Sequence, residues 1–117
     1  MYRVRNLTKQ TIVAEHVSAA TQLWDRLIGL LAHSKLEESH GLWIERCKSI
    51  HTHFMRFSID VVFISKNGEV LRVFQDVRPF RVTPWIRKAS AVLEMPAGTL
   101  KNRPIACGDR LSLEAVA

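Results

Sequence analysis

The 117-residue chain has little of what would mark an exported, disulfide-bonded or membrane protein. Its two cysteines, Cys47 and Cys107, fit free thiols better than a disulfide framework. No apolar run approaches the roughly 20 residues of a membrane span, and the first twenty residues lack the apolar core of an export signal. We therefore expect a cytoplasmic protein without a membrane span. Acidic residues are also few, eleven against seventeen lysines and arginines, so the formal net charge of +6 permits an anionic partner without identifying one.

The rest of the composition predicts one globular domain over residues 1–117, because a chain of this length can build a single core. Short alternating segments at 1–6 and 11–17 predict two strands around a polar turn. Apolar residues at helical spacing predict one helix over 22–36.

A β-hairpin is the clearest local prediction, because Asn67-Gly68 separates two alternating apolar runs, 59–64 and 69–75. Its first strand should turn Ile59, Val61 and Phe63 toward the main core. Further strands are expected at 41–44, 91–95 and 110–116. Pro79 and Pro84 exclude a central strand from 76–88, which predicts a surface loop or an edge strand there.

These elements predict a mainly β fold with one α-helix, a small single-domain β-sandwich or barrel. The motifs RLIGLLAHSKL, GLW, IHTHFMRFSIDVVFI, RPFRV, AVLEMPAG and CGDRL follow one another between residues 7 and 113. In this order and spacing they resemble the bacterial and archaeal domain of unknown function family 192. The resemblance implies a compact, jelly-roll-like, mainly β domain and brings no established activity. The chain departs from the family pattern at His53 and Ser58, so a role that depends on His53 would be particular to this chain.

The stretch 46–65 concentrates the unusual side chains. If 50–55 is an extended strand, His51, His53 and Met55 share one face, opposite Thr52 and Phe54. We expect the histidine face to border the principal concave site, with Arg78 or Arg81 at the same rim. The candidate ligand-binding residues are His51, Thr52, His53, Met55, Arg56, Asp60, Arg78, Arg81 and Glu94.

Asp60 and Glu94 lie in otherwise apolar strands, where an ionised carboxylate needs a partner. At least one is expected to pair with an arginine from Arg56, Arg78 or Arg81. Such a pair would fix the basic loop onto the sheet, and the alternative is a polar cleft in which the arginines face an anionic ligand.

Three functions remain open, and the sequence does not decide whether the protein is an enzyme. The first is a binding or accessory module for a small anionic ligand at an arginine-rimmed cleft, without a cofactor. The second is a metal- or thiol-dependent enzyme using Cys47, His51 and His53, whose donors suit zinc or copper but whose spacing matches no standard framework, so no metal is assigned. The third is single-stranded nucleic-acid binding through the basic segment 72–88, which lacks a recognised nucleic-acid-binding motif.

Overall fold

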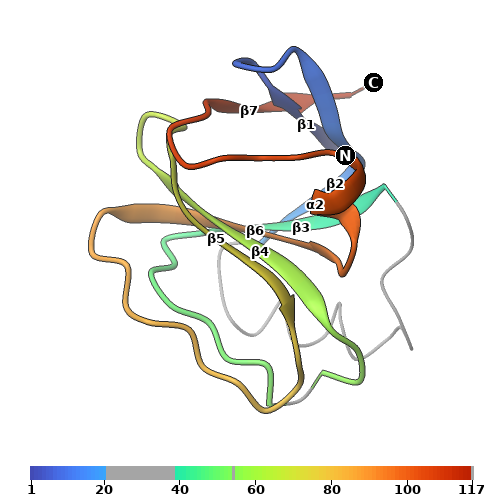
Figure 1. Ribbon diagram of the computed structural model, residues 1–117. Coiled ribbons are helices and arrows are strands. Elements are labelled where there is room, and N and C mark those ends of the chain that lie inside the picture. The colour runs from blue at the N-terminus through green and yellow to red at the C-terminus, as the bar shows by residue number, and fades with distance from the viewer. Residues whose placement is uncertain (21–38, 54, 117) are drawn as a thin grey trace.

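The computed structural model describes residues 1–20, 39–53 and 55–116 (Figure 1). The helix expected over 22–36 lies outside these residues. The described elements are β1 (Tyr2–Asn6), β2 (Thr11–Ala20), β3 (His40–Glu45), β4 (Ile59–Ser65), β5 (Val70–Val77), β6 (Ala89–Pro96), α2 (Thr99–Asn102) and β7 (Leu111–Ala115). Every strand predicted outside the stretch 50–55 overlaps an observed strand, and the mainly β fold is confirmed. The short helix α2 was not predicted.

One seven-stranded sheet runs in the order β5-β4-β6-β3-β2-β1-β7. Neighbouring strands are antiparallel except β2 and β3, which pair in parallel. The sheet curls until its two edge strands approach each other at one end. There Glu69 and Arg110 form an isolated bridge, and the Leu111 N–H donates to the Gly68 carbonyl at 2.8 Å. The sheet is therefore a half-barrel that is closed at one end.

The predicted hairpin is present as β4 and β5, joined by a turn in which Gly68 has φ of 86°. The Ser65 hydroxyl stabilises this turn by accepting hydrogen bonds from the amides of Asn67 and Glu69 at 3.3 and 3.1 Å. Ile59, Val61 and Phe63 share one face and are buried together, but in the smaller of two apolar cores rather than in the main one as predicted. The alternate residues of the same strand are also buried, because β4 is covered on both faces. This explains why its sequence is apolar from Val61 to Ile64 without alternation.

Two apolar cores flank the sheet. The first contains side chains from most of the strands and α2, among them Val4, Val17, Val62, Leu93 and Leu100. The second lies on the opposite face of β3, β4 and β6, and it also contains Ile50, Met55 and Ile86. These three residues come from the connections 46–58 and 78–88, here called the loop pair. The loop pair therefore covers the second core as an irregular layer.

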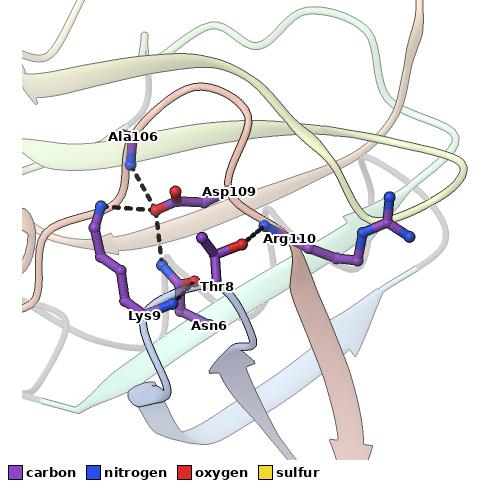
Figure 2. A network of polar contacts seen from close by, with 6 residues as sticks. All are labelled: Asn6, Thr8, Lys9, Ala106, Asp109 and Arg110. Carbon is purple, nitrogen blue, oxygen red and sulfur yellow. Dashed lines mark hydrogen bonds and ion pairs between the residues drawn. The ribbon is translucent and has the colours of Figure 1, made fainter.

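A polar cluster joins the β1–β2 turn to the turn that precedes β7 (Figure 2). One carboxylate oxygen of Asp109 accepts from the Asn6 side-chain amide at 2.9 Å, the Lys9 ammonium at 2.8 Å and the Ala106 N–H at 3.0 Å. Thr8 adds a fourth contact, because its hydroxyl accepts from the Arg110 N–H at 2.9 Å. The Ala106 N–H, followed by Lys9 and Asn6, lowers the pKa of Asp109 to about 2. The cluster thus fastens the first strands to the last one.

Candidate ligand-binding site

The predicted extended strand over 50–55 is wrong. His51 forms only an isolated bridge with Val82, and the Met55 N–H turns back to the Thr52 carbonyl at 3.2 Å. The partner of this segment is the loop 78–88, whose prolines at 79 and 84 have no N–H to donate to a regular ladder. A pattern of alternating side chains therefore exists here without a strand.

Backbone hydrogen bonds nevertheless fasten the two loops side by side along most of their length (Figure 1). The Thr52 N–H donates to the Arg81 carbonyl at 2.8 Å, and the Phe80 N–H donates to the Thr52 carbonyl at 3.0 Å. Further along, the Thr83 N–H reaches the Ile50 carbonyl at 2.9 Å. The basic proline-containing loop is therefore fixed in place by the segment that carries the histidines.

Thr52 and Thr83 reinforce this attachment with their hydroxyl groups. The buried Thr52 hydroxyl donates to the Arg78 carbonyl at 2.6 Å and accepts from the Arg81 N–H at 2.9 Å. Thr83 makes the reciprocal contact from the loop 78–88 to the segment 46–58, because its hydroxyl accepts from the Ile50 N–H at 2.9 Å. Thr52 was a ligand-binding candidate, and its hydroxyl is here engaged with the loop backbone. It fixes the backbone from which the side chains of Arg78 and Arg81 extend.

The structure brings His51 and His53 together, with ring centroids 5.2 Å apart. The His53 ring also meets Phe80 nearly edge-on, with centroids 6.1 Å apart. Met55, by contrast, is buried in the second core, and Arg56 is exposed. The Cys47 thiol donates to the Ser49 carbonyl at 3.1 Å.

Cys47 and Cys107 are not joined by a disulfide, as predicted. Across residues 1–20, 39–53 and 55–116, no three histidine, cysteine or acidic side chains gather in an arrangement that could hold a metal ion. In the same part of the chain, no helix has the length and the apolar character needed to cross a membrane.

At least one of Asp60 and Glu94 was predicted to pair with an arginine, and the hydrogen bonds of the Asp60 carboxylate within the described residues come from backbone amides instead. Asp60 is buried, and its carboxylate accepts from the N–H groups of Asp76 at 2.9 Å, Gly98 at 3.2 Å and Leu100 at 3.0 Å. A bulge in β5 opposite Asp60, where Asp76 has φ of 52°, supplies the first amide. The other two come from the start of α2, from its N-cap residue Gly98 and from Leu100 in its first turn, where backbone N–H groups have no acceptor within the helix. Glu94 is fully buried in β6.

A pocket of about 370 Å³ lies between the end of β5 and the loop 78–88. Its lining residues are Phe74, Asp76, Val77, Arg78, Arg81, Val82, Thr83 and Pro84. Of the predicted site residues, the pocket lining includes only Arg78 and Arg81. Neither His51 nor His53 is among these lining residues, so the predicted histidine face does not line the pocket that carries the two arginines.

The loop pair carries the entire excess of positive charge. Seven of the seventeen basic residues and none of the eleven acidic residues lie in 46–58 and 78–88, so the remainder of the chain has ten basic and eleven acidic residues. The ion pairs within the described residues are Arg3–Glu114, Arg5–Glu114 and Lys9–Asp109, and none includes a residue of either loop. Arg46 and Lys48 also belong to this basic set and were not among the predicted site residues. The available signal was the absence of acidic residues from 46–58.

Comparison with known proteins places this fold in a family. The model of the domain of unknown function family 192 (DUF192), described as "Uncharacterized ACR", matches residues 4–113. A UPF0127 protein of Pyrococcus furiosus is 36% identical over 63 residues, which are 54% of this chain and 53% of that protein. The chain therefore aligns with about half the length of this curated relative.

Two solved structures share the fold. A proposed transcription regulator from Sinorhizobium meliloti has a TM-score of 0.78 at 22% identity, and the match covers 96% of this chain and 91% of that one. A protein of unknown function from Novosphingobium aromaticivorans has a TM-score of 0.76 at 18% identity, with 95% and 82% covered. At these identities, the likeness concerns the fold alone.

Proposed function

The chain belongs to the DUF192 family, whose description assigns no activity, and we propose that it is a binding module for a small anionic ligand. The observation that carries this proposal is the pocket beside β5, which is lined by two exposed arginines without a carboxylate partner among the described residues. Guanidinium groups are suited to such ligands because they donate parallel hydrogen bonds to carboxylate or phosphate oxygens.

The surroundings of the pocket support the same function. Its volume of about 370 Å³ lies within the range of small-molecule sites. The Thr52 hydroxyl holds the backbone at both arginines, so the two guanidinium groups start from fixed positions. Phe74 and Val77 offer an apolar wall, while Asp76 would repel an anionic group at its own side. The ligand would therefore place its anionic group against Arg78 and Arg81, and a neutral or donor group toward Asp76.

The enzymatic alternative receives no comparable support. His51 and His53 lie together, but the Cys47 thiol is directed to the Ser49 carbonyl. None of the three lines the pocket that holds the arginines. We therefore propose binding rather than catalysis as the activity of this site.

An amide-resolved NMR titration with inorganic pyrophosphate tests the proposal. We expect shifts confined to residues 74–84 and their partners in 50–52. The double variant Arg78→Gln, Arg81→Gln should weaken binding about tenfold or more, because each charge-assisted hydrogen bond contributes roughly 1.5–3 kcal/mol.

A control variant that loses the same number of positive charges elsewhere distinguishes binding at this pocket from attraction to the overall positive charge of the protein. The variant Lys66→Gln, Arg110→Gln also removes two exposed cations, but outside the loop pair. Its affinity should remain within about twofold of the unmodified protein at about 0.15 M salt, where distant charges are screened. Equal weakening in both double variants would contradict a specific site, and so would shifts centred elsewhere.

A further inference from the structure

The loop 78–88 exposes apolar surface that the fold does not use. Six large hydrophobic side chains are exposed among the described residues, and three of them lie in this one loop. Phe80 is 69% exposed, Val82 66% and Trp85 70%. The other three lie outside the loop pair, at Met1, Leu7 and Val116. Exposed apolar groups that gather in one short segment indicate a contact surface.

Hydrogen bonds prevent this loop from folding its apolar side chains inward. The backbone around Phe80 is bonded to Thr52 on both sides of the residue, at the Phe80 and Arg81 N–H groups. Beyond Trp85, the Ile86 N–H donates to the Lys48 carbonyl at 2.8 Å, and the Lys48 ammonium donates to the Arg87 carbonyl at 2.6 Å. The exposure of the aromatic rings is therefore built into the fold and needs no rearrangement before binding.

Cations alternate with the aromatic side chains along this loop. Arg78 precedes Phe80, Arg81 follows it, and Arg87 and Lys88 come after Trp85, all of them exposed. A fully extended chain spans at most about 3.6 Å per residue, so the Cα atoms of Phe80 and Trp85 are at most about 18 Å apart. A short run of nucleotides covers such a span, since known single-strand-binding domains contact roughly 4–16 nucleotides.

We propose that the loop pair binds single-stranded nucleic acid, with backbone phosphates at the arginines and bases stacked on Phe80 and Trp85. The inference rests on the anionic-ligand function proposed above, and it names the chemical class of that ligand. The Arg78–Arg81 pocket holds one phosphate group, and the exposed rings on the same loop take the neighbouring bases. The edge-on contact with His53 positions the Phe80 ring.

The combination of charges and rings selects this ligand over other polyanions. An acidic peptide would use the cations, but it would leave the aromatic rings without a planar partner. In a duplex the base faces are already stacked, and no described residue of the loop pair is helical and able to enter a major groove. Five of the seven cations are arginines, whose planar groups both pair with phosphate and stack on bases.

Fluorescence anisotropy with labelled twelve-residue oligo-dT and oligo-U tests the inference on the full chain. The affinity should fall with salt, with a log–log slope of about −1.4 or steeper if two or more phosphates are neutralised. Phe80→Leu and Trp85→Leu should each weaken binding about fivefold or more, because they keep an apolar side chain and remove the ring. Phe80→Tyr and Trp85→Phe keep a ring, and should bind within about twofold of the unmodified protein.

Three results would overturn the inference. The first is oligonucleotide binding that both leucine variants leave unchanged. The second is equally effective competition by polyglutamate of equal charge, and the third is binding to phosphatidylserine vesicles with no binding to either oligonucleotide. The pyrophosphate titration separates this failure from that of the proposed function. Pyrophosphate binding at Arg78 and Arg81 without oligonucleotide binding removes the nucleic-acid inference alone, whereas loss of both removes both.

Discussion

Asp60 is a single side chain that holds three separate segments together. It lies on β4, and its carboxylate accepts from the β5 bulge and from the start of α2. Gly98 precedes α2 and offers no side-chain cap of its own, so Asp60 caps this helix from a distant strand. The carboxylate satisfies amides that would otherwise be buried without an acceptor, and these amides stabilise its charge in return.

Removing this carboxylate should destabilise the protein strongly. Asp60→Ala leaves three amides without an acceptor, and we expect the free energy of unfolding to fall by roughly 3 kcal/mol or more. Asp60→Asn should cost less, because its remaining oxygen can still accept from the two amides at α2. Urea denaturation measures both changes. The control is Asp76→Asn, since the exposed Asp76 contributes its backbone N–H to this site and asparagine tolerates its positive φ. An Asp60→Ala variant within about 1 kcal/mol of the unmodified protein would contradict this role.

The burial of this carboxylate could be predicted, but its partners could not. An aspartate within a run of apolar strand residues signals a buried charge, and the sequence indicated that for both Asp60 and Glu94. The donors to Asp60 are backbone amides 16, 38 and 40 positions away. Every residue but proline carries such an amide, so no residue type marks the partner. An arginine was the natural expectation because only side-chain charges are visible in a sequence.

At the level of elements, the hairpin could be predicted from local sequence, whereas the pairing of the two loops could not. The hairpin depends on Asn67-Gly68 and on residues within a few positions of it, so local turn chemistry specifies it. The segment 46–58 meets 78–88 through pairs about thirty positions apart, such as Thr52 with Arg81. Its alternating pattern indicated a strand, but the partner that it meets is broken by prolines. The arginine pocket follows from that pairing and was therefore only partly predictable.

Gly68 closes the half-barrel and allows a test at this level. A Cβ atom at this position would lie 2.6 Å from the Leu111 carbonyl oxygen, where the hairpin turn meets the approach to β7. Gly68→Ala should therefore lower the free energy of unfolding by more than the roughly 1 kcal/mol that a positive φ alone costs. Gly108→Ala is the matched control, because Gly108 has a similar φ of 93° and a methyl group there would meet nothing within 4 Å among the described residues. Thermal unfolding compares the two variants, and equal losses would show that the contact at Leu111 is unimportant.

For the whole molecule, the number and places of the strands were largely predictable because alternation is a local signal. The order of the strands was not, since β1 pairs with β7 and β3 with β6 across long stretches of chain. The family resemblance agreed with the mainly β fold that the predicted strands already indicated, but it did not specify the strand order. The helix α2 escaped prediction because it is only four residues long and is capped from β4.

The cluster around Asp109 links the first and last strands, and it should make stability depend on pH. The folded-state pKa of Asp109 is lowered from 3.8 to about 2, so its contribution is complete above about pH 4 and is lost as the pH falls toward 2. Asp109→Asn should therefore be less stable than the unmodified protein near pH 6, and the difference should narrow between pH 4 and 2. Glu114, whose pKa is lowered by its hydrogen bond to Arg3, is present in both proteins and cancels in the comparison. A difference that stays constant down to pH 2 would contradict the assignment.

The position of β1 between β2 and β7 has a consequence for the time course of folding. Val4, which is fully buried, lies opposite Leu113, more than a hundred positions away. A ribosome that adds about 5–20 residues per second completes β1 long before it reaches residues 111–115. During that interval one edge of the nascent sheet has no partner and is open to pairing with other chains. Folding should also be slow for a chain of this size, because it must join segments that are remote in sequence, such as β1 and β7.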